Sequence, residues 1–289
     1  MKLGDRMIVS MKDMLNKARK EKYAVAQFNI NNLEWTKYIL QECQSNNSPV
    51  ILGVSEGATK YMGGFNVVTS LVKSLVKDLN ITIPIAIHLD HSSSLENCIN
   101  AINAGFTSVM IDASQEILDE NIKITKEVIK YASKYKVTVE AEVGAIGGTE
   151  DGITNTATYA KVDESIRFTR ETKVDFLAPA LGSVHGLYTG QPNLDFKRML
   201  EIGIKTSTPL VLHGGTGIPD DMIKQSISCG IVKINVNTEL QVVWYNAMRN
   251  FIAKNPTIYD PRKIIGAGEL AIKDAVKQKI ILFGSYNKA

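Results

Sequence analysis

The chain has 289 residues, of which 44% are hydrophobic and 22% are charged, and its net charge is only +3. It contains no Lys/Arg-rich run and no stretch of roughly 20 apolar residues, so we expect neither nucleic acid nor a membrane as a partner. Three isolated cysteines and a polar N-terminus without a secretory leader favour a soluble protein of a reducing, cytoplasmic compartment.

In chain order, short apolar segments rich in Val and Ile alternate with amphipathic segments of helical periodicity. The predicted strands are 24–28, 49–54, 84–89, 108–112, 137–143, 175–180, 209–213 and 231–236. The predicted helices are 32–46, 64–80, 95–104, 119–135, 163–172, 194–206, 220–229 and 238–254, and the tail after about residue 255 carries one more. Near-continuous apolar strands indicate a parallel sheet buried on both faces. We therefore predict an α/β fold over residues 1–289, a single (β/α)8 TIM-barrel domain with a C-terminal helical tail.

The main alternative is an open, doubly wound sheet. Such a sheet usually carries a glycine-rich fingerprint after its first strand, whereas Phe28 is followed by N-I-N-N-L-E. The barrel is therefore favoured. Two segments that follow strands, Gly144–Lys161 and Leu181–Asn193, are long for such connections, and we expect them at the carboxyl-terminal face of the barrel as candidate lids.

Polar side chains stand at the carboxyl ends of the predicted strands. They are Asn29, Ser55, Asp90, His91, Asp112, Glu142, His185, His213 and Asn235. In a barrel these ends meet at one mouth, where polar groups are more often catalytic than structural. Three of the four histidines are in this set, and three imidazoles plus a water or substrate form an open zinc site of the catalytic type. For His88, which lies inside its strand, a hydrogen-bonded structural role is the better interpretation.

The carboxylates of this set have more than one interpretation. Asp90 stands beside a predicted ligand, where an aspartate can bind the metal, orient a ligand or transfer a proton. Asp112 and Glu142 supply the oxygen ligands of a second metal position, or else form an ion pair with a barrel lysine such as Lys233. The residues alone leave these alternatives open.

Two polar turns follow the last two strands, H-G-G-T-G (213–217) and N-V-N-T (235–238). Backbone N–H groups in glycine-rich loops and at helix N-termini bind phosphate without a net positive charge. Barrel enzymes often bind phosphate in these two loops. The residues together predict a metal-dependent barrel enzyme that acts on a small phosphorylated substrate and polarises a carbonyl group.

The motifs that carry these residues resemble the class II, zinc-dependent fructose-bisphosphate aldolase family, in the bacterial branch shared with tagatose-bisphosphate aldolases. The resemblance covers nearly the whole chain. It rests on A-I-H-L-D-H (86–91), G-F-T-S-V-M-I-D (105–112), V-E-A-E-V-G (139–144), G-G-T-E-D (147–151), A-P-A-L-G-S-V-H-G (178–186), P-L-V-L-H-G-G-T-G-I-P (209–219), K-I-N-V-N-T (233–238) and Y-D-P-R-K (259–263). It implies a lyase that reversibly cleaves fructose 1,6-bisphosphate to dihydroxyacetone phosphate and glyceraldehyde 3-phosphate in glycolysis and gluconeogenesis.

The resemblance also implies roles for individual residues. One zinc ion per subunit would be held by His91, His185 and His213, with Asp112 and Glu142 as ligands of a displaced metal. Asp90 would transfer the proton of the C4 hydroxyl, and Glu150 that of C3. Substrate-binding residues would be Asn29, Ser55, Gly186, Gly214, Gly215, Thr216, Asn235, Val236, Asn237, Thr238 and Arg262. Arg262 would meet the distal phosphate from a neighbouring subunit of a homodimer or homotetramer, and a monovalent cation (Na⁺ or K⁺) would lie near the other phosphate.

One segment departs from the pattern of the branch. After M-I-D-A-S, relatives usually carry a histidine, whereas this chain has Q-E-I-L-D-E-N (115–121). The departure touches no predicted zinc ligand and concerns the subgroup. The alternatives are a tagatose-1,6-bisphosphate aldolase, a Schiff-base aldolase using Lys233, a zinc hydrolase and a non-catalytic barrel.

Overall fold

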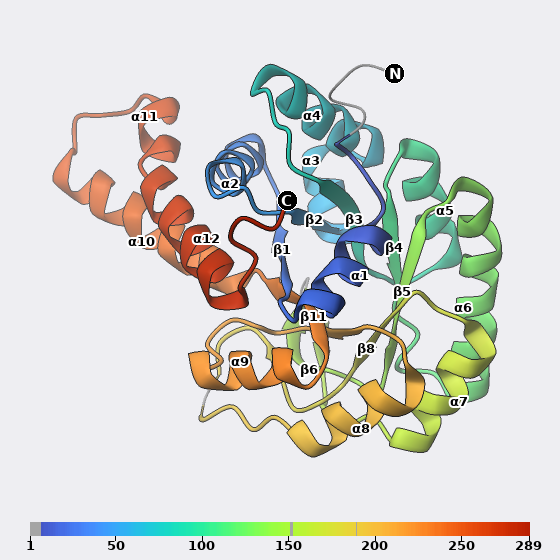
Figure 1. Cartoon of the computed structure of the whole chain (residues 1–289). Helices are drawn as coiled ribbons and strands as arrows, with labels where there is room; N and C mark the ends of the chain where they lie inside the picture. The colour runs from blue at the N-terminus through green and yellow to red at the C-terminus, as the bar shows by residue number, and fades with distance from the viewer. Residues whose placement is uncertain (1–6, 151–152, 189) are drawn as a thin grey trace.

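The computed structural model describes residues 7–150, 153–188 and 190–289, and its centre is a closed barrel of parallel strands (Figure 1). Around the barrel the strand order is β1-β11-β10-β8-β5-β4-β3-β2, so neighbours in sequence are neighbours in space until the last strand closes on the first. The strands are β1 (Val25–Asn29), β2 (Val50–Ser55), β3 (Ile85–Ser92), β4 (Ser108–Ile111), β5 (Thr138–Val143), β8 (Phe176–Pro179), β10 (Leu210–Leu212) and β11 (Ile231–Val236). The predicted TIM barrel is confirmed.

Helices connect the strands on the outside of the barrel, as Figure 1 shows. Those predicted from periodicity are α2 (Leu33–Ser45), α4 (Phe65–Asp78), α5 (Leu95–Ala104), α6 (Leu118–Ala132), α7 (Val162–Thr172), α8 (Phe196–Thr206), α9 (Asp220–Ser228) and α10 (Thr238–Lys254). Two shorter elements join them, α3 (Glu56–Met62) and the 3₁₀ turn η2 (Ser133–Tyr135). Among the described residues, no helix is both long enough and apolar enough to cross a bilayer.

A helix that was not predicted, α1 (Met11–Glu21), closes the amino-terminal end of the barrel. Its buried residues Met11, Met14, Leu15 and Ala18 pack into one apolar cluster with inward side chains of the strands, among them those of β8. The second and larger cluster lies between the strands and the surrounding helices. The bottom of the barrel is thus filled with apolar side chains, and polar groups are confined to its upper layers.

The two long segments at the mouth are not wholly irregular. They contribute β6 (Gly147–Glu150), β7 (Ile153–Asn155) and β9 (Val184–His185), which pair in the order β7-β6-β9. The pairing of β6 with β9 is parallel and joins Gly148 to His185. The pairing was not predicted, because hydrogen bonds between two distant segments cannot be read from either one.

The C-terminal tail contains two helices, α11 (Pro261–Gly266) and α12 (Glu269–Phe283), where one was expected. The Pro261 ring begins α11, and the Asp260 side chain caps it by accepting from the Arg262 N–H. Figure 1 shows α10 and α11 extending away from the barrel, while α12 returns to pack on α2 and α10.

Candidate active site

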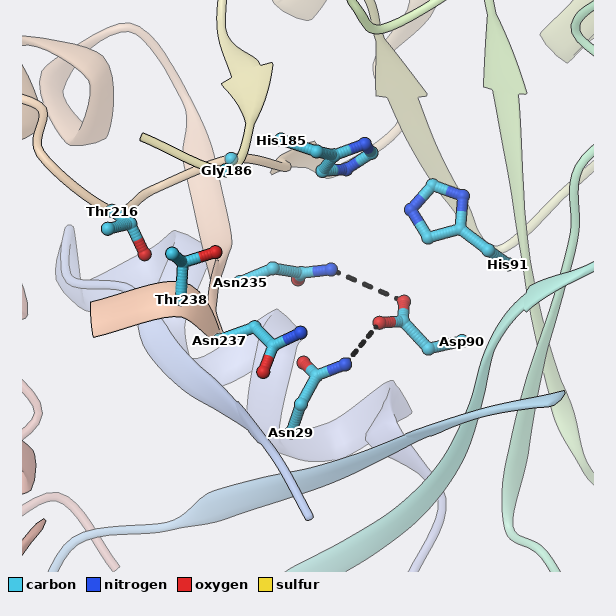
Figure 2. Close-up of a pocket in the computed structure, with 10 residues that line it drawn as sticks. Asn29, Asp90, His91, His185, Gly186, Thr216, Asn235, Asn237 and Thr238 are labelled. Carbon is cyan, nitrogen blue, oxygen red and sulfur yellow. Dashed lines mark hydrogen bonds between the residues drawn. The ribbon is translucent and has the colours of Figure 1, made fainter. Parts of the chain in front are cut away.

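The end of β3 supplies two adjacent side chains to the mouth of the barrel. Successive side chains of a strand normally point to opposite faces. His91, however, adopts a left-handed backbone conformation with φ of +47°, and the pairing of β3 with β4 shifts between Leu89 and Ser92. This irregularity lets both Asp90 and His91 face the pocket, as Figure 2 shows. Left-handed geometry at a residue with a side chain costs on the order of 1–3 kcal/mol, which is typical of functional positions.

Three histidines converge at this mouth from different strands. His91, His185 and His213 each offer a ring nitrogen, and these nitrogens lie within 4.8 Å of one another. The rings are packed edge to face, with centroids 4.8 Å apart for His91 and His185 and 4.6 Å apart for His91 and His213. The predicted set is therefore brought together, with the composition of an open zinc site.

Carboxylates behind two of the rings decide which nitrogen faces the site. The Nδ1 of His91 lies 3.0 Å from Oδ2 of Asp112, and the Nε2 of His213 lies 2.8 Å from Oε1 of Glu140. Because ionised carboxylates only accept hydrogen bonds, each of these nitrogens carries the hydrogen. The opposite nitrogens then present lone pairs, and those of His91 and His213 face each other across 2.8 Å. Two lone pairs at this distance repel each other unless a proton or a metal ion lies between or beside them, and the arrangement fits a metal site.

The charges around the three histidines also favour a positive charge in the site. Burial disfavours a charged His91, but its hydrogen bond to Asp112 and the nearby charges of Asp90 and Asp112 outweigh burial and raise its pKa to about 10. Burial lowers the pKa of His213, against the opposing effect of Glu140, and burial also lowers that of His185 well below its usual range. The site therefore favours one positive charge, which in the metal-free protein is a proton on His91, while His185 and His213 stay neutral.

Asp90 is held by two amide groups (Figure 2). The Nδ2 of Asn29 donates to its Oδ2 at 2.9 Å, and the Nδ2 of Asn235 lies 3.4 Å from its Oδ1. Burial opposes the charge of this carboxyl group. Nevertheless, the pKa of Asp90 is held well below its usual range by its electrostatic interactions with His91, His213 and Lys233. Asp90 is therefore an ionised carboxylate in a fixed orientation, and Asn29, expected to contact substrate, helps to orient it.

A second potential metal position adjoins the first. Ligand atoms of His91, Asp112 and Glu142 also lie within 4.8 Å of one another. One Glu142 oxygen accepts from the Ile146 N–H at 2.9 Å, while the other is buried without a hydrogen-bond partner. Burial and the charge of Asp112 raise the pKa of Glu142 to about 8. The alternative of an ion pair between these carboxylates and Lys233 was wrong, because Lys233 pairs with Glu140 instead.

The predicted phosphate loops border the same pocket. Its lining consists of Asn29, Asp90, His91, His185, Gly186, Gly214, Thr216, Asn235, Asn237 and Thr238. Gly186 has φ of +92° and no heavy atom near its missing Cβ, so its backbone is open to the pocket. The Thr216 hydroxyl accepts from the Glu239 N–H at 3.2 Å, which joins the first loop to the N-terminus of α10. A small anionic group fits this surface of backbone and hydroxyl groups.

Residues 9–288 match the model of the family described as "Fructose-bisphosphate aldolase class-II". The chain belongs to this family. It is 56% identical over 283 residues to the fructose-bisphosphate aldolase of Geobacillus stearothermophilus and 54% identical to that of Staphylococcus aureus, and both alignments cover 98% of this chain and 99% of the relative. The crystal structure of the YdjI aldolase from Escherichia coli K12 matches with a TM-score of 0.85 and 33% identity, and covers 98% of this chain and all of that one.

For a class II aldolase, the position of Lys233 is informative. A Schiff-base lysine must reach the substrate, but Lys233 is fully buried inside the barrel and donates to both oxygens of Glu140, at 2.8 and 3.0 Å. It is not among the residues that line the mouth pocket. This placement argues against the Schiff-base alternative and agrees with the metal-dependent class.

Four of the residues expected to bind substrate do not line the pocket that contains Asp90 and His91. Gly215 uses its N–H to bond the Asn235 carbonyl at 3.0 Å, and the Val236 side chain is buried in the outer core. Ser55 caps α3 and lines a neighbouring pocket, which shares Asn29 and Asn237 with the first. Arg262 is 88% exposed and pairs with Asp260 on α11, outside both pockets.

The close contact by which Gly148 supports the backbone of His185 was not predicted from the sequence. The backbone of Gly148 approaches that of His185 so closely that a Cβ would overlap the His185 carbonyl, and φ of Gly148 is +94°. The second glycine of G-G-T-E was the available signal, since glycine in a strand often marks a close backbone approach. Glu150 ends β6, but its side chain lies outside the described part of the structure.

Proposed function

We propose that this chain catalyses the reversible cleavage of fructose 1,6-bisphosphate to dihydroxyacetone phosphate and glyceraldehyde 3-phosphate, as a cytoplasmic enzyme of glycolysis and gluconeogenesis. The observation that carries the proposal is the convergence of three histidines and the ionised Asp90 in one pocket bordered by phosphate-type loops. The names of the curated relatives, which this chain matches over nearly its whole length, support the choice of substrate.

His91, His185 and His213 would hold one Zn²⁺ ion, with Asp112 and Glu142 available to a displaced ion. When bound, the ion supplies an electrophile that polarises the substrate's carbonyl group. Asp112 and Glu140 orient two of the rings. The role of these side chains is therefore to fix the ligand nitrogens before the substrate arrives.

Asp90 would act as the base in the cleavage direction. Its carboxylate accepts the proton of the C4 hydroxyl, and the C3–C4 bond breaks as the C4 oxygen becomes an aldehyde oxygen. The bonding electrons remain on C3, which Glu150 then protonates. In the condensation direction Asp90 returns its proton to the new C4 oxygen. The two amides of Asn29 and Asn235 keep the carboxylate aimed at this oxygen.

The loops would bind the two ends of the substrate. Gly186, Gly214, Thr216, Asn237 and Thr238 line the part suited to one phosphate, where a Na⁺ or K⁺ ion would add positive charge. The neighbouring pocket, lined by Ser55, Gln241 and others, has room for the distal half.

We propose that the protein is a homodimer or homotetramer. Exposed apolar residues on α10 and after it, Val242, Tyr245, Ile252 and Tyr259, support self-association through the projecting helices. In such an assembly Arg262, which is remote from the pocket of its own chain, would reach the distal phosphate of a neighbour.

The deciding measurement is the initial rate of fructose 1,6-bisphosphate cleavage before EDTA, after EDTA and after Zn²⁺ is added back. We expect activity to disappear with EDTA and to return with Zn²⁺. Activity that persists in EDTA, together with borohydride trapping of a Schiff base between enzyme and substrate, would contradict the metal-dependent mechanism. Tagatose 1,6-bisphosphate assayed in parallel tests the substrate, since the two sugars differ only at C4.

A further inference from the structure

One layer below the mouth, three polar side chains form a cluster in which Glu140 contacts the proposed ligand His213, while Lys233 and His88 have no role in the proposed chemistry. His88, Glu140 and Lys233 each stand two residues before a polar residue of the site, so the alternation of side chains along a strand places them inside the barrel, one step deeper. All three are fully buried. A buried ion pair adds little net stability because desolvation offsets the attraction, so stability alone does not account for this cluster.

The contacts connect this layer to a predicted metal ligand. Lys233 on β11 donates to both oxygens of Glu140 on β5 and thereby fixes the carboxylate from below. The Oε1 atom of the same carboxylate accepts from the Nε2 of His213 on β10 at 2.8 Å. His88 bonds to the Ser108 hydroxyl through Nδ1, with its Nε2 3.9 Å from Glu140, so it takes no direct part in this contact.

We propose that Lys233 and Glu140 are positioning residues that fix His213 in the tautomer whose Nδ1 lone pair faces the metal site. The Nδ1 atom freed by this tautomer lies 2.8 Å from Nε2 of His91, on the side of the proposed metal site. The Asn235 amide nitrogen lies 3.3 Å from Nδ1 and 3.4 Å from Nε2 of His213, so it does not distinguish the two tautomers. Lys233 is essential to this arrangement, because it prevents the Glu140 carboxylate from rotating and balances its charge. The inference rests on the proposed role of His213 as a metal ligand.

Replacing Glu140 and Lys233 together removes the carboxylate behind His213 without leaving an unpaired buried charge. In the double variant Glu140→Gln/Lys233→Met no net charge remains in the layer, so neither partner is left buried and unpaired. The neutral amide introduced by Glu140→Gln can either donate to Nε2 of His213 or accept from it, so the tautomer with the hydrogen on Nε2 is no longer enforced and the charge-assisted hydrogen bond is lost. We therefore expect the dissociation constant for Zn²⁺ to rise about 10- to 100-fold, the usual effect of losing a carboxylate behind a histidine ligand.

The experiment uses the full chain, stripped of metal and titrated with Zn²⁺ against a chromophoric chelator, and repeats the titration with Co²⁺ to record the visible absorption of the site. The control is Glu269→Gln/Lys273→Met, which removes a surface-proximal ion pair of α12 and is expected to keep the parent affinity. Far-UV circular dichroism establishes that each variant is folded. Weaker Zn²⁺ binding with an altered Co²⁺ spectrum in the first variant alone supports the proposal.

A His213→Ala variant distinguishes the possible failures. If His213→Ala loses affinity while Glu140→Gln/Lys233→Met binds Zn²⁺ as tightly as the parent, the positioning role is overturned and the metal site stands. If the parent binds Zn²⁺ no more tightly than His213→Ala, the proposed metal site and this inference are both overturned.

Discussion

At the scale of single residues, the site depends on side chains that differ in environment more than in type. Asp90 and Glu142 are both buried carboxyl groups within the same mouth, yet their pKa values move in opposite directions. Asp90 lies among positive and donor groups, whereas Glu142 faces another carboxylate, Asp112. The first is therefore ionised and carries no proton, and the second would ionise at neutral pH only when a cation offsets its charge.

Replacement of the proposed base tests its role directly. We expect Asp90→Ala to lower kcat by about 10²- to 10⁴-fold, since the C4 hydroxyl loses its proton acceptor. The bound zinc should remain, because the three histidines are untouched. Steady-state kinetics and the zinc content of the purified variant check both statements. Loss of the metal together with activity would show instead that Asp90 is a ligand.

The raised pKa of Glu142 predicts a pH dependence of stability in the metal-free protein. The carboxyl group of Glu142 has a pKa near 8 in the folded state and near 4.5 in the unfolded state, so it ionises more readily after unfolding. At any pH above about 4.5 this difference favours the unfolded state. Stability through this group is therefore lost as the pH rises from about 4.5 to 8, by about 2 kcal/mol between pH 6 and 8. Denaturant titrations in EDTA should show that Glu142→Gln loses less stability than the parent over this interval. Parallel losses in the two proteins would contradict the prediction.

At the scale of elements, strand ends and loops hold the site together. The small sheet of β6, β7 and β9 joins two segments that are remote in sequence and fixes the backbone of His185. The helix α1 acts at the opposite end, where it seals the barrel with apolar side chains. The polar layers therefore lie between α1 at one end of the barrel and the mouth pocket at the other.

The close approach of Gly148 to His185 gives a prediction for this sheet. Gly148→Ala introduces a Cβ against the His185 carbonyl at a backbone position with positive φ, so we expect a loss of about 1–3 kcal/mol of stability and weaker zinc binding. Gly190→Ala is the matched control, because Gly190 has open space around its missing Cβ. Melting temperature and zinc affinity are measured for both. A Gly148→Ala protein equal to the control would show that the sheet does not support His185.

At the scale of the whole molecule, we propose that residues 1–289 form one domain. The C-terminal helix α12 packs on α2, and the Phe283 carbonyl accepts from the Ala24 N–H beside the first strand. The last residue, Ala289, donates its N–H to the Asn47 carbonyl. The end of the chain is thus attached to the beginning of the barrel.

The two tryptophans make this proposal testable. Trp35 on α2 and Trp244 on α10 pack edge to face with ring centroids 5.9 Å apart, so their fluorescence reports on the contact between barrel and tail. We expect the fluorescence and far-UV circular dichroism transitions in urea to coincide, as for a cooperative unit. A fluorescence transition at a clearly lower urea concentration would show that the tail unfolds separately from the barrel.

The sequence alone determined the barrel, its strand segments, the family and the three histidines with Asp90, because these follow from short-range periodicity and from contiguous motifs. A strand buried on both faces is mostly apolar, and polar residues that follow the apolar run mark the mouth of the barrel, as Asp90 and His91 do after Leu89. Such signals need only the residues next to one another in the chain.

The tertiary structure decided what depends on partners distant in sequence. Lys233 pairs with Glu140, 93 residues away, and not with Asp112 or Glu142, because register around the barrel sets which side chains share a layer. The pairing of β6 with β9 has the same origin. The tautomers of His91 and His213, and the opposite pKa shifts of Asp90 and Glu142, also arise only there, since burial and neighbouring charges exist only after the barrel has closed.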